Sequence, residues 1–119
     1  MAIGLTAQRR LTTWFINQVP TTVSLQRYDK VKKPAGGWVR EPAGVRDPQV
    51  VSLVEPTGLP TPSVTIDGVE RKVDFIMVCE WDAEFEVGET FTHQGRSWAI
   101  VEEYYDNQYE RRALVVARG

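Results

Sequence analysis

The sequence predicts a mainly β protein: a small antiparallel β-barrel or sandwich with a short N-terminal α-helix and a long Pro-rich loop. First, a single stretch near the start has helical spacing and is ended by Pro20. Second, short alternating segments follow, separated by Gly, Asp and Asn turns at the spacing of about 8–12 residues that is typical of small β folds. Third, 119 residues with 42% hydrophobic and 25% charged side chains are typical of one globular domain, over residues 1–119.

Residues 5–19 are expected to form the helix. Thr6 is a plausible N-cap, and Pro20 ends the helical geometry. Apolar side chains recur at helical spacing, at Leu11, Trp14, Phe15 and Val19. An apolar stripe of this period usually faces the core of its own domain, which is the favoured interpretation. The alternative is that the stripe docks on a neighbouring subunit.

The β pattern begins with a first hairpin over residues 21–41. Val23 and Leu25 share one face of its first strand, and Gly36 and Gly37 lie in the turn before the returning strand. Residues 42–63 follow as a long Pro/Gly-rich loop, which contains five of the seven prolines around one strand-like run at 49–54. A segment of this length and composition is usually functional or mobile.

Residues 64–119 are expected to form a β-meander that closes the barrel. Asp67-Gly68 between two alternating segments is a strong hairpin signal. The strand after it presents a wholly apolar face, made of Val73, Phe75, Met77, Cys79 and Trp81. Two further turns, at Gly95 and at residues 106–108, join the remaining strands.

The net charge of −2 conceals two halves of opposite sign. Residues 1–46 carry eight basic and two acidic side chains, a net charge of +6, whereas the remainder carries a net charge of −8. A near-neutral total argues against a general nucleic-acid coat. Complementary charges on one chain suit a protein that binds copies of itself, because charge fixes register and steers association.

The acidic run 80–89 is the most conspicuous local feature of the sequence. If it is extended, its carboxylates lie along one face, at Glu80, Asp82, Glu84 and Glu86. Carboxylates in a row diverge by about 7 Å per pair, whereas a Ca²⁺ site or a glycosidase needs them to converge. A solvated or partner-facing stripe is therefore favoured over a metal site.

An enzyme is poorly supported. Cys79 and His93 are the only candidates for a nucleophile and its base, and Cys79 lies on the apolar face of its strand. The chain has no phosphate-binding loop, no GxSxG and no HExxH. We expect no catalytic, cofactor-binding or metal-binding residues and no cofactor.

Basic side chains cluster on the first hairpin, at Arg27, Lys30, Lys32, Lys33 and Arg40. With Tyr28 and Trp38 beside them, they resemble the binding face of an oligonucleotide-binding barrel, so a single-stranded nucleic-acid-binding module is the alternative function. The simpler interpretation is a solvated loop whose lysines discourage edge pairing. The acidic remainder of the chain favours the simpler interpretation.

No targeting or membrane segment is predicted. Arg9 and Arg10 interrupt the start of the chain, and the longest apolar run, residues 75–79, is far below the roughly 20 residues that cross a bilayer. One free cysteine without a signal peptide fits a reducing compartment, so synthesis and first folding in the cytosol are expected.

A set of short segments along nearly the full length carries a family resemblance. They are Ile3-Gly4-Leu5-Thr6, Trp14-Phe15, residues 20–23, residues 34–38, residues 67–71, residues 87–89, residues 95–96, residues 98–101 and residues 109–112. Together they resemble the head-to-tail stopper (head-closure, or head–tail connector) proteins of bacteriophages with long, non-contractile tails, most closely those of phages that infect actinobacteria.

The resemblance implies a virion structural protein without catalytic residues. Family members are small β-barrels that form a ring, a hexamer, below the portal and adaptor rings and above the tail terminator or tail tube. The ring continues the channel for genomic double-stranded DNA, closes it after packaging and offers the surface on which the tail docks. The implied lumen or gating loop comprises Pro56, Thr57, Gly58, Leu59, Pro60, Asp67 and Gly68. The charge split independently gives candidate charge patches between subunits, Arg27, Lys30, Lys32, Lys33 and Arg40 with Glu80, Asp82, Glu84 and Glu86; the acidic stripe could instead line the channel.

Overall fold

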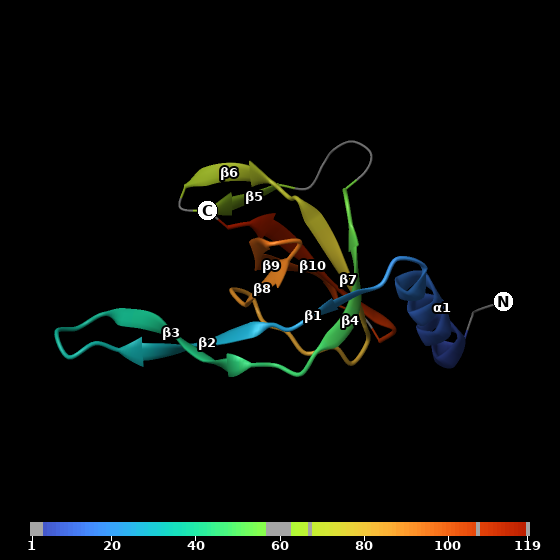
Figure 1. Cartoon of the computed structure of the whole chain (residues 1–119), viewed down its shortest axis with the longest axis horizontal. Helices are drawn as coiled ribbons and strands as arrows, with labels where there is room; N and C mark the ends of the chain where they lie inside the picture. The colour runs from blue at the N-terminus through green and yellow to red at the C-terminus, as the bar shows by residue number, and fades with distance from the viewer. Residues whose placement is uncertain (1–3, 57–62, 67, 107, 119) are drawn as a thin grey trace.

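The protein is mainly β, with one N-terminal helix and an eight-strand antiparallel sheet curled into a half-barrel (Figure 1). This computed structural model describes residues 4–56, 63–66, 68–106 and 108–118. Within them the elements are α1 (Leu5–Gln18), β1 (Thr21–Val23), β2 (Gln26–Lys32), β3 (Trp38–Val45), β4 (Gln49–Val54), β5 (Ser63–Ile66), β6 (Val69–Lys72), β7 (Phe75–Glu80), β8 (Thr90–His93), β9 (Arg96–Asp106) and β10 (Glu110–Ala117).

The sheet has the strand order β1-β4-β7-β10-β9-β8-β2-β3, and β5 and β6 form a separate two-stranded sheet. β1 and β2 follow each other in the chain, although they pair with distant strands. β1 pairs with β4, whereas Gln26 of β2 pairs with Thr90 of β8. The short link at Ser24 and Leu25 therefore connects two remote parts of the sheet, which is what curls it.

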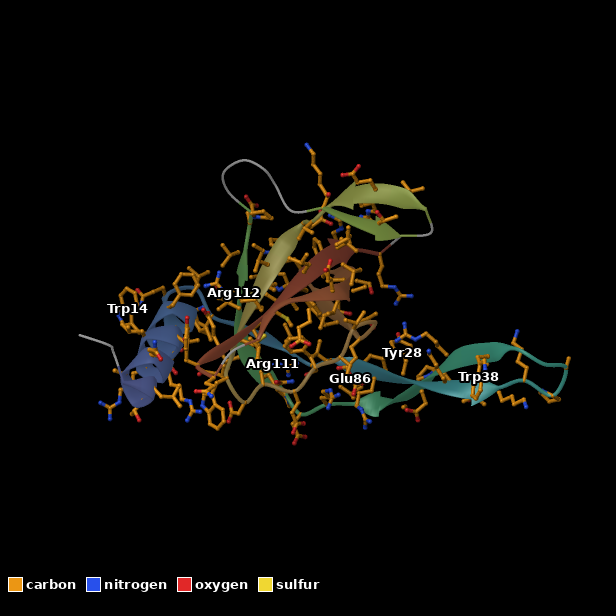
Figure 2. The ribbon with its side chains drawn as sticks, turned by 180° about the vertical axis from the view of Figure 1, so that it is seen from behind. Trp14, Tyr28, Trp38, Glu86, Arg111 and Arg112 are labelled. Atoms are coloured by element: carbon orange, nitrogen blue, oxygen red, sulfur yellow. The ribbon has the colours of Figure 1, made fainter. Side chains whose placement is uncertain are left out.

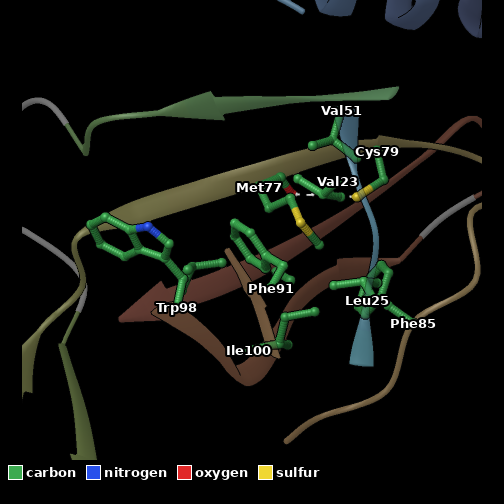
Figure 3. Close-up of a cluster of buried hydrophobic side chains, with 11 residues drawn as sticks. Val23, Leu25, Val51, Met77, Cys79, Phe85, Phe91, Trp98 and Ile100 are labelled. Carbon is green, nitrogen blue, oxygen red and sulfur yellow. Dashed lines mark hydrogen bonds between the residues drawn. The ribbon is translucent and has the colours of Figure 1, made fainter. Parts of the chain in front are cut away.

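The main core lies inside the curl (Figure 3). Val23 and Leu25 are both buried, as their alternation predicted. The other members come from β4, β7, β8, β9, β10 and the 81–89 segment: Val51, Met77, Cys79, Phe85, Phe91, Trp98, Ile100, Ala113 and Val115. This cluster fixes the sheet, because it draws apolar side chains from both of its ends.

Two elements cover parts of the outer face of the sheet. The β5–β6 hairpin closes over a second apolar cluster made of Val64, Val73, Leu114 and Val116. Helix α1 packs against β4 and β7. Successive residues of β10 thus point alternately into the two clusters, which explains its continuous apolar sequence. Within the described ranges, no helix has the length and apolarity needed to cross a membrane.

Helix α1 differs from its prediction in two respects. It begins at Leu5, with Gly4 as an N-cap that makes no side-chain hydrogen bond, so Thr6 is not the cap. Its buried side chains are Thr12 and Ile16, and not the predicted stripe. Four predicted core residues are exposed: Leu11, Trp14, Phe15 and Val19. The expectation that this stripe packs on its own domain is wrong, because the contact face of α1 is narrow and lies to one side of the stripe.

The first hairpin and the segment after it are also arranged differently. The hairpin consists of β2 and β3 and runs from Gln26 to Val45, whereas β1 leaves it to pair with β4. Part of the predicted 42–63 loop is strand, because residues 42–45 end β3 and residues 49–54 form β4. Pro42 is tolerated within β3 because β3 is an edge strand, where a missing N–H costs no ladder bond.

The 64–119 region is a meander only in part. β8, β9 and β10 are neighbours in sequence and in the sheet, but β7 pairs with β4 and β10. β7 is buried on both faces, since Met77 and Cys79 point into the main core and Val78 is buried as well. The predicted apolar face of this strand therefore ends before Trp81, which is exposed, and Val73 belongs to the second cluster.

Candidate interaction surfaces

The β2–β3 hairpin, called the arm below, projects from the body along the long axis of the molecule (Figure 1). The molecule extends 59 Å along this axis and 32 and 30 Å along the other two. The arm ends in a turn at residues 33–37, where Gly36 and Gly37 have φ values of 92° and 81° that favour glycine. Almost every side chain between Asp29 and Pro42 is exposed. The arm therefore has no core of its own.

Cross-strand register gives the arm two different faces. Lys30 lies opposite Arg40, and Lys32 lies opposite Trp38. Side chains at paired positions share a face, so one face is basic and aromatic. The intervening pairs are Asp29 with Glu41 and Val31 with Val39, which make the other face acidic and apolar. Trp38 is 67% exposed on the basic face, beyond the body (Figure 2).

A buried ion pair holds the base of the arm. The Arg46 guanidinium donates hydrogen bonds of 2.8 and 2.9 Å to the two carboxylate oxygens of Glu89. The two side chains are only 16% and 3% exposed. The hydrogen bond to Glu89 raises the pKa of Arg46 above its ordinary value, despite the opposing cost of burial. No local sequence pattern indicates this ion pair, because the two residues are 43 positions apart in the chain.

A second arginine, Arg40, holds the arm to the body at a position in β3, six residues before Arg46 in the sequence. Its guanidinium lies 5.0 Å from the centre of the Tyr28 ring, and the Tyr28 hydroxyl is hydrogen-bonded to Thr90 at 3.0 Å. Arg40 also lies against Gly88, where a side chain would collide with the guanidinium and where φ is 95°. Gly88 is therefore required both by its backbone conformation and by the close approach of Arg40.

The acidic run is a loop and not an extended strand, which corrects the predicted stripe. β7 ends at Glu80, and residues 81–89 lie outside the strands and lead into β8. Phe85 is buried, with the Arg111 guanidinium 4.0 Å from its ring, and this anchors the middle of the loop. Asp82, Glu84 and Glu86 are exposed, whereas Glu80 is half-buried and accepts a hydrogen bond from Thr13 at 3.0 Å.

The predicted charge patches meet partly within one chain. Arg27 and Arg46 line a cleft of ≈ 650 Å³ together with Glu80, Asp82 and Glu84. Arg40 lies beside the same acidic loop at Gly88. The three lysines of the arm are exposed and outside this cleft, at Lys30, Lys32 and Lys33. Only the outer part of the basic patch is thus directed away from the chain's own acids.

The second exposed surface is the apolar ridge of α1, defined as Leu11, Trp14, Phe15 and Val19. These side chains are 55%, 61%, 42% and 66% exposed. Trp14 lies on the side of the helix away from the sheet (Figure 2). A groove of ≈ 330 Å³ runs beside the ridge, between Leu11 and Phe15 on one side and the segment 109–112 on the other.

The helix is firmly fixed beneath this ridge. Arg9 lies 3.7 Å from the centre of the Trp81 ring and donates a 2.9 Å hydrogen bond to the carbonyl of Gln108. Ile16 is 1% exposed. The ridge is therefore a preformed surface and not a frayed terminus.

The predicted lumen loop is described only in part. Pro56 lies just beyond β4, and Gly68 forms the turn of the β5–β6 hairpin with a φ of 80°. Thr57, Gly58, Leu59, Pro60 and Asp67 lie outside the described residues.

Cys79 and His93 are not arranged as a nucleophile and base. Cys79 is 1% exposed in the main core, and burial raises the pKa of its thiol to about 12. His93 is on β8, which β9 and β10 separate from β7 in the sheet. Among residues 4–56, 63–66, 68–106 and 108–118, no three His, Cys, Asp or Glu side chains gather as a metal site.

We expect the Cys79 thiol to be unreactive in the native protein. A coloured disulfide reagent at pH 8 should label it only after unfolding by denaturant, since the thiolate is the attacking species. Because the folded pKa is raised, this cysteine stabilises the fold below its ordinary pKa of about 9, and that contribution is lost as the pH rises towards 12. Rapid labelling of the folded chain would contradict this.

Comparison with protein-family models and with curated proteins finds no match for the chain.

Proposed function

We propose that the chain is a virion structural protein that forms a ring at the head–tail interface of a long-tailed bacteriophage. The ring would continue the DNA channel, close it after packaging and provide the surface on which the tail docks. Its partners would be other copies of itself, the portal and adaptor assembly above, tail terminator or tail tube proteins below, and genomic duplex passing through without sequence-specific contact. No catalysis, cofactor, metal or membrane has a part in this function.

The observation that carries the proposal is the arm. An isolated two-stranded hairpin is at best marginally stable in water. Here the hairpin extends well beyond the body and exposes Val31 and Trp38 near its end. Exposed apolar side chains on such an arm suit a contact with another protein chain. If that chain is a second copy, repetition of the same contact can build a ring.

The charge distribution supports the same function. Asp82, Glu84 and Glu86 expose carboxylates in one loop. A surface of this sign facing a channel would let duplex DNA slide, because basic contacts are what hold a phosphate backbone. The overall resemblance of the sequence to head-to-tail stoppers supplies the place in the virion.

Sedimentation of the full chain over a range of concentrations tests the proposal. We expect a single multi-subunit species at high concentration; a monomer at every concentration would contradict it. The basic and aromatic face of the arm favours one second candidate, a single-stranded nucleic-acid-binding module. A short oligonucleotide added at low salt separates the two, because only the second candidate predicts salt-dependent co-sedimentation with the monomer.

A further inference from the structure

The large exposed apolar side chains of the described residues gather mainly in two places. One is the ridge of α1, and the other is the arm, with Val31, Trp38 and Val45. α1 and the arm lie at opposite ends of the molecule (Figure 1). Two such surfaces on one chain cannot cover each other, because 59 Å separates the extremes of this axis.

We propose that the arm of one copy docks on the α1 ridge of the next copy; this inference rests on the proposed ring and identifies its interface. A ring requires a heterologous contact, in which each subunit uses two different surfaces. The arm and the ridge are different, unpartnered within the chain, and placed at its two ends. Each copy would bind one neighbour through its arm and the other neighbour through its ridge, so that a closed ring leaves neither surface free.

Apolar contact supplies the attraction. Trp38, on the basic and aromatic face of the arm, meets Leu11, Trp14 and Phe15 on the ridge, and the groove beside Phe15 offers space for a side chain. Exposed aromatic side chains of this kind carry much of the binding energy at protein interfaces, because they bury a large area at a small entropic cost.

The C-terminal end of α1 suits a basic partner. Arg9 and Arg10 lie in the first half of the helix and its last turn contains no basic side chain, so no positive charge there balances the negative end of the helix dipole. The arm carries three exposed lysines around Trp38, at Lys30, Lys32 and Lys33. Lysines placed at a helix C-terminus stabilise it, which fixes the direction in which the arm lies on the helix.

A mixing experiment tests the contact. A ridge variant (Trp14→Ala with Phe15→Ser) and an arm variant (Trp38→Ala) alter only exposed side chains, so both should fold, as circular dichroism and thermal unfolding will show. The control is Val69→Ser, which removes a 63% exposed valine from the β5–β6 hairpin. We expect each test variant to raise the concentration needed for assembly more than about tenfold, and the control to leave it unchanged.

Equal amounts of the two variants should form a complex of two subunits and no larger one. The intact arm of the ridge variant can dock on the intact ridge of the arm variant. The two remaining surfaces are the mutated ridge and the mutated arm, which cannot bind a third subunit. If both variants assemble like the wild type, the proposed contact between arm and ridge is wrong, but the proposed ring is not contradicted. Assembly of the arm variant alone, or no complex in the mixture, also overturns it. A wild-type chain that never assembles overturns the proposed function itself.

Discussion

Replacing Arg46 with methionine is expected to lower the free energy of unfolding by about 3 kcal/mol. The substitution leaves the buried Glu89 carboxylate, which is 3% exposed, without the guanidinium that balances its negative charge. Removing one partner of a buried ion pair costs about 3–5 kcal/mol, and Arg46 is at the low end because it borders an open cleft. Urea titration followed by circular dichroism measures the change.

The matched control is Arg71→Met. Arg71 pairs with Asp74 at 3.7 Å, but both side chains are more than two fifths exposed, at 42% and 41%. Exposed pairs contribute about 0–1 kcal/mol, so this variant should unfold nearly like the wild type. In the double variant Arg46→Met with Glu89→Leu, the loss should be smaller than the sum of the two single losses. Equal effects of Arg46→Met and Arg71→Met would contradict a buried clamp at the base of the arm.

Shortening the arm is expected to abolish assembly while preserving the fold. Residues 31–39 are replaced by Asn-Gly, which closes a two-residue turn between the paired Lys30 and Arg40. Arg40 then keeps its place on Tyr28, and the removed residues contribute no fully buried side chain. Stability should therefore change by less than about 1 kcal/mol, as for other surface changes.

Sedimentation measures the oligomeric state of the shortened chain at concentrations where the full chain assembles. A monomer is expected, with a melting temperature close to that of the full chain. Unfolding of the shortened chain would show that the arm supports the body, whereas normal assembly would show that the arm is not part of the interface.

The sequence predicted the parts of the fold that local chemistry determines. The turns at Gly36-Gly37, at Gly68 and at Gly95 are where the chain reverses, and each of these glycines has a positive φ. The strand around Cys79 and the alternation at Val23 were found because a period of two residues is visible locally. These features need no knowledge of distant parts of the chain.

The errors concern which surfaces meet. Periodicity grouped Leu11, Trp14 and Phe15 correctly on one side of the helix, but it does not tell which side contacts the sheet, and Ile16 and Thr12 make that contact. The alternation of the acidic run is compatible with a strand, whereas residues 81–89 form a loop in which Phe85 is buried. The Arg46–Glu89 pair arises only from the tertiary fold.

The most direct test of a head-to-tail ring is electron microscopy of the assembled species. The arrangement proposed above predicts a closed ring with a central lumen, in which every arm lies on the α1 ridge of the next copy around the ring. A two-fold symmetric pair with α1 against α1, or an open filament, would contradict it.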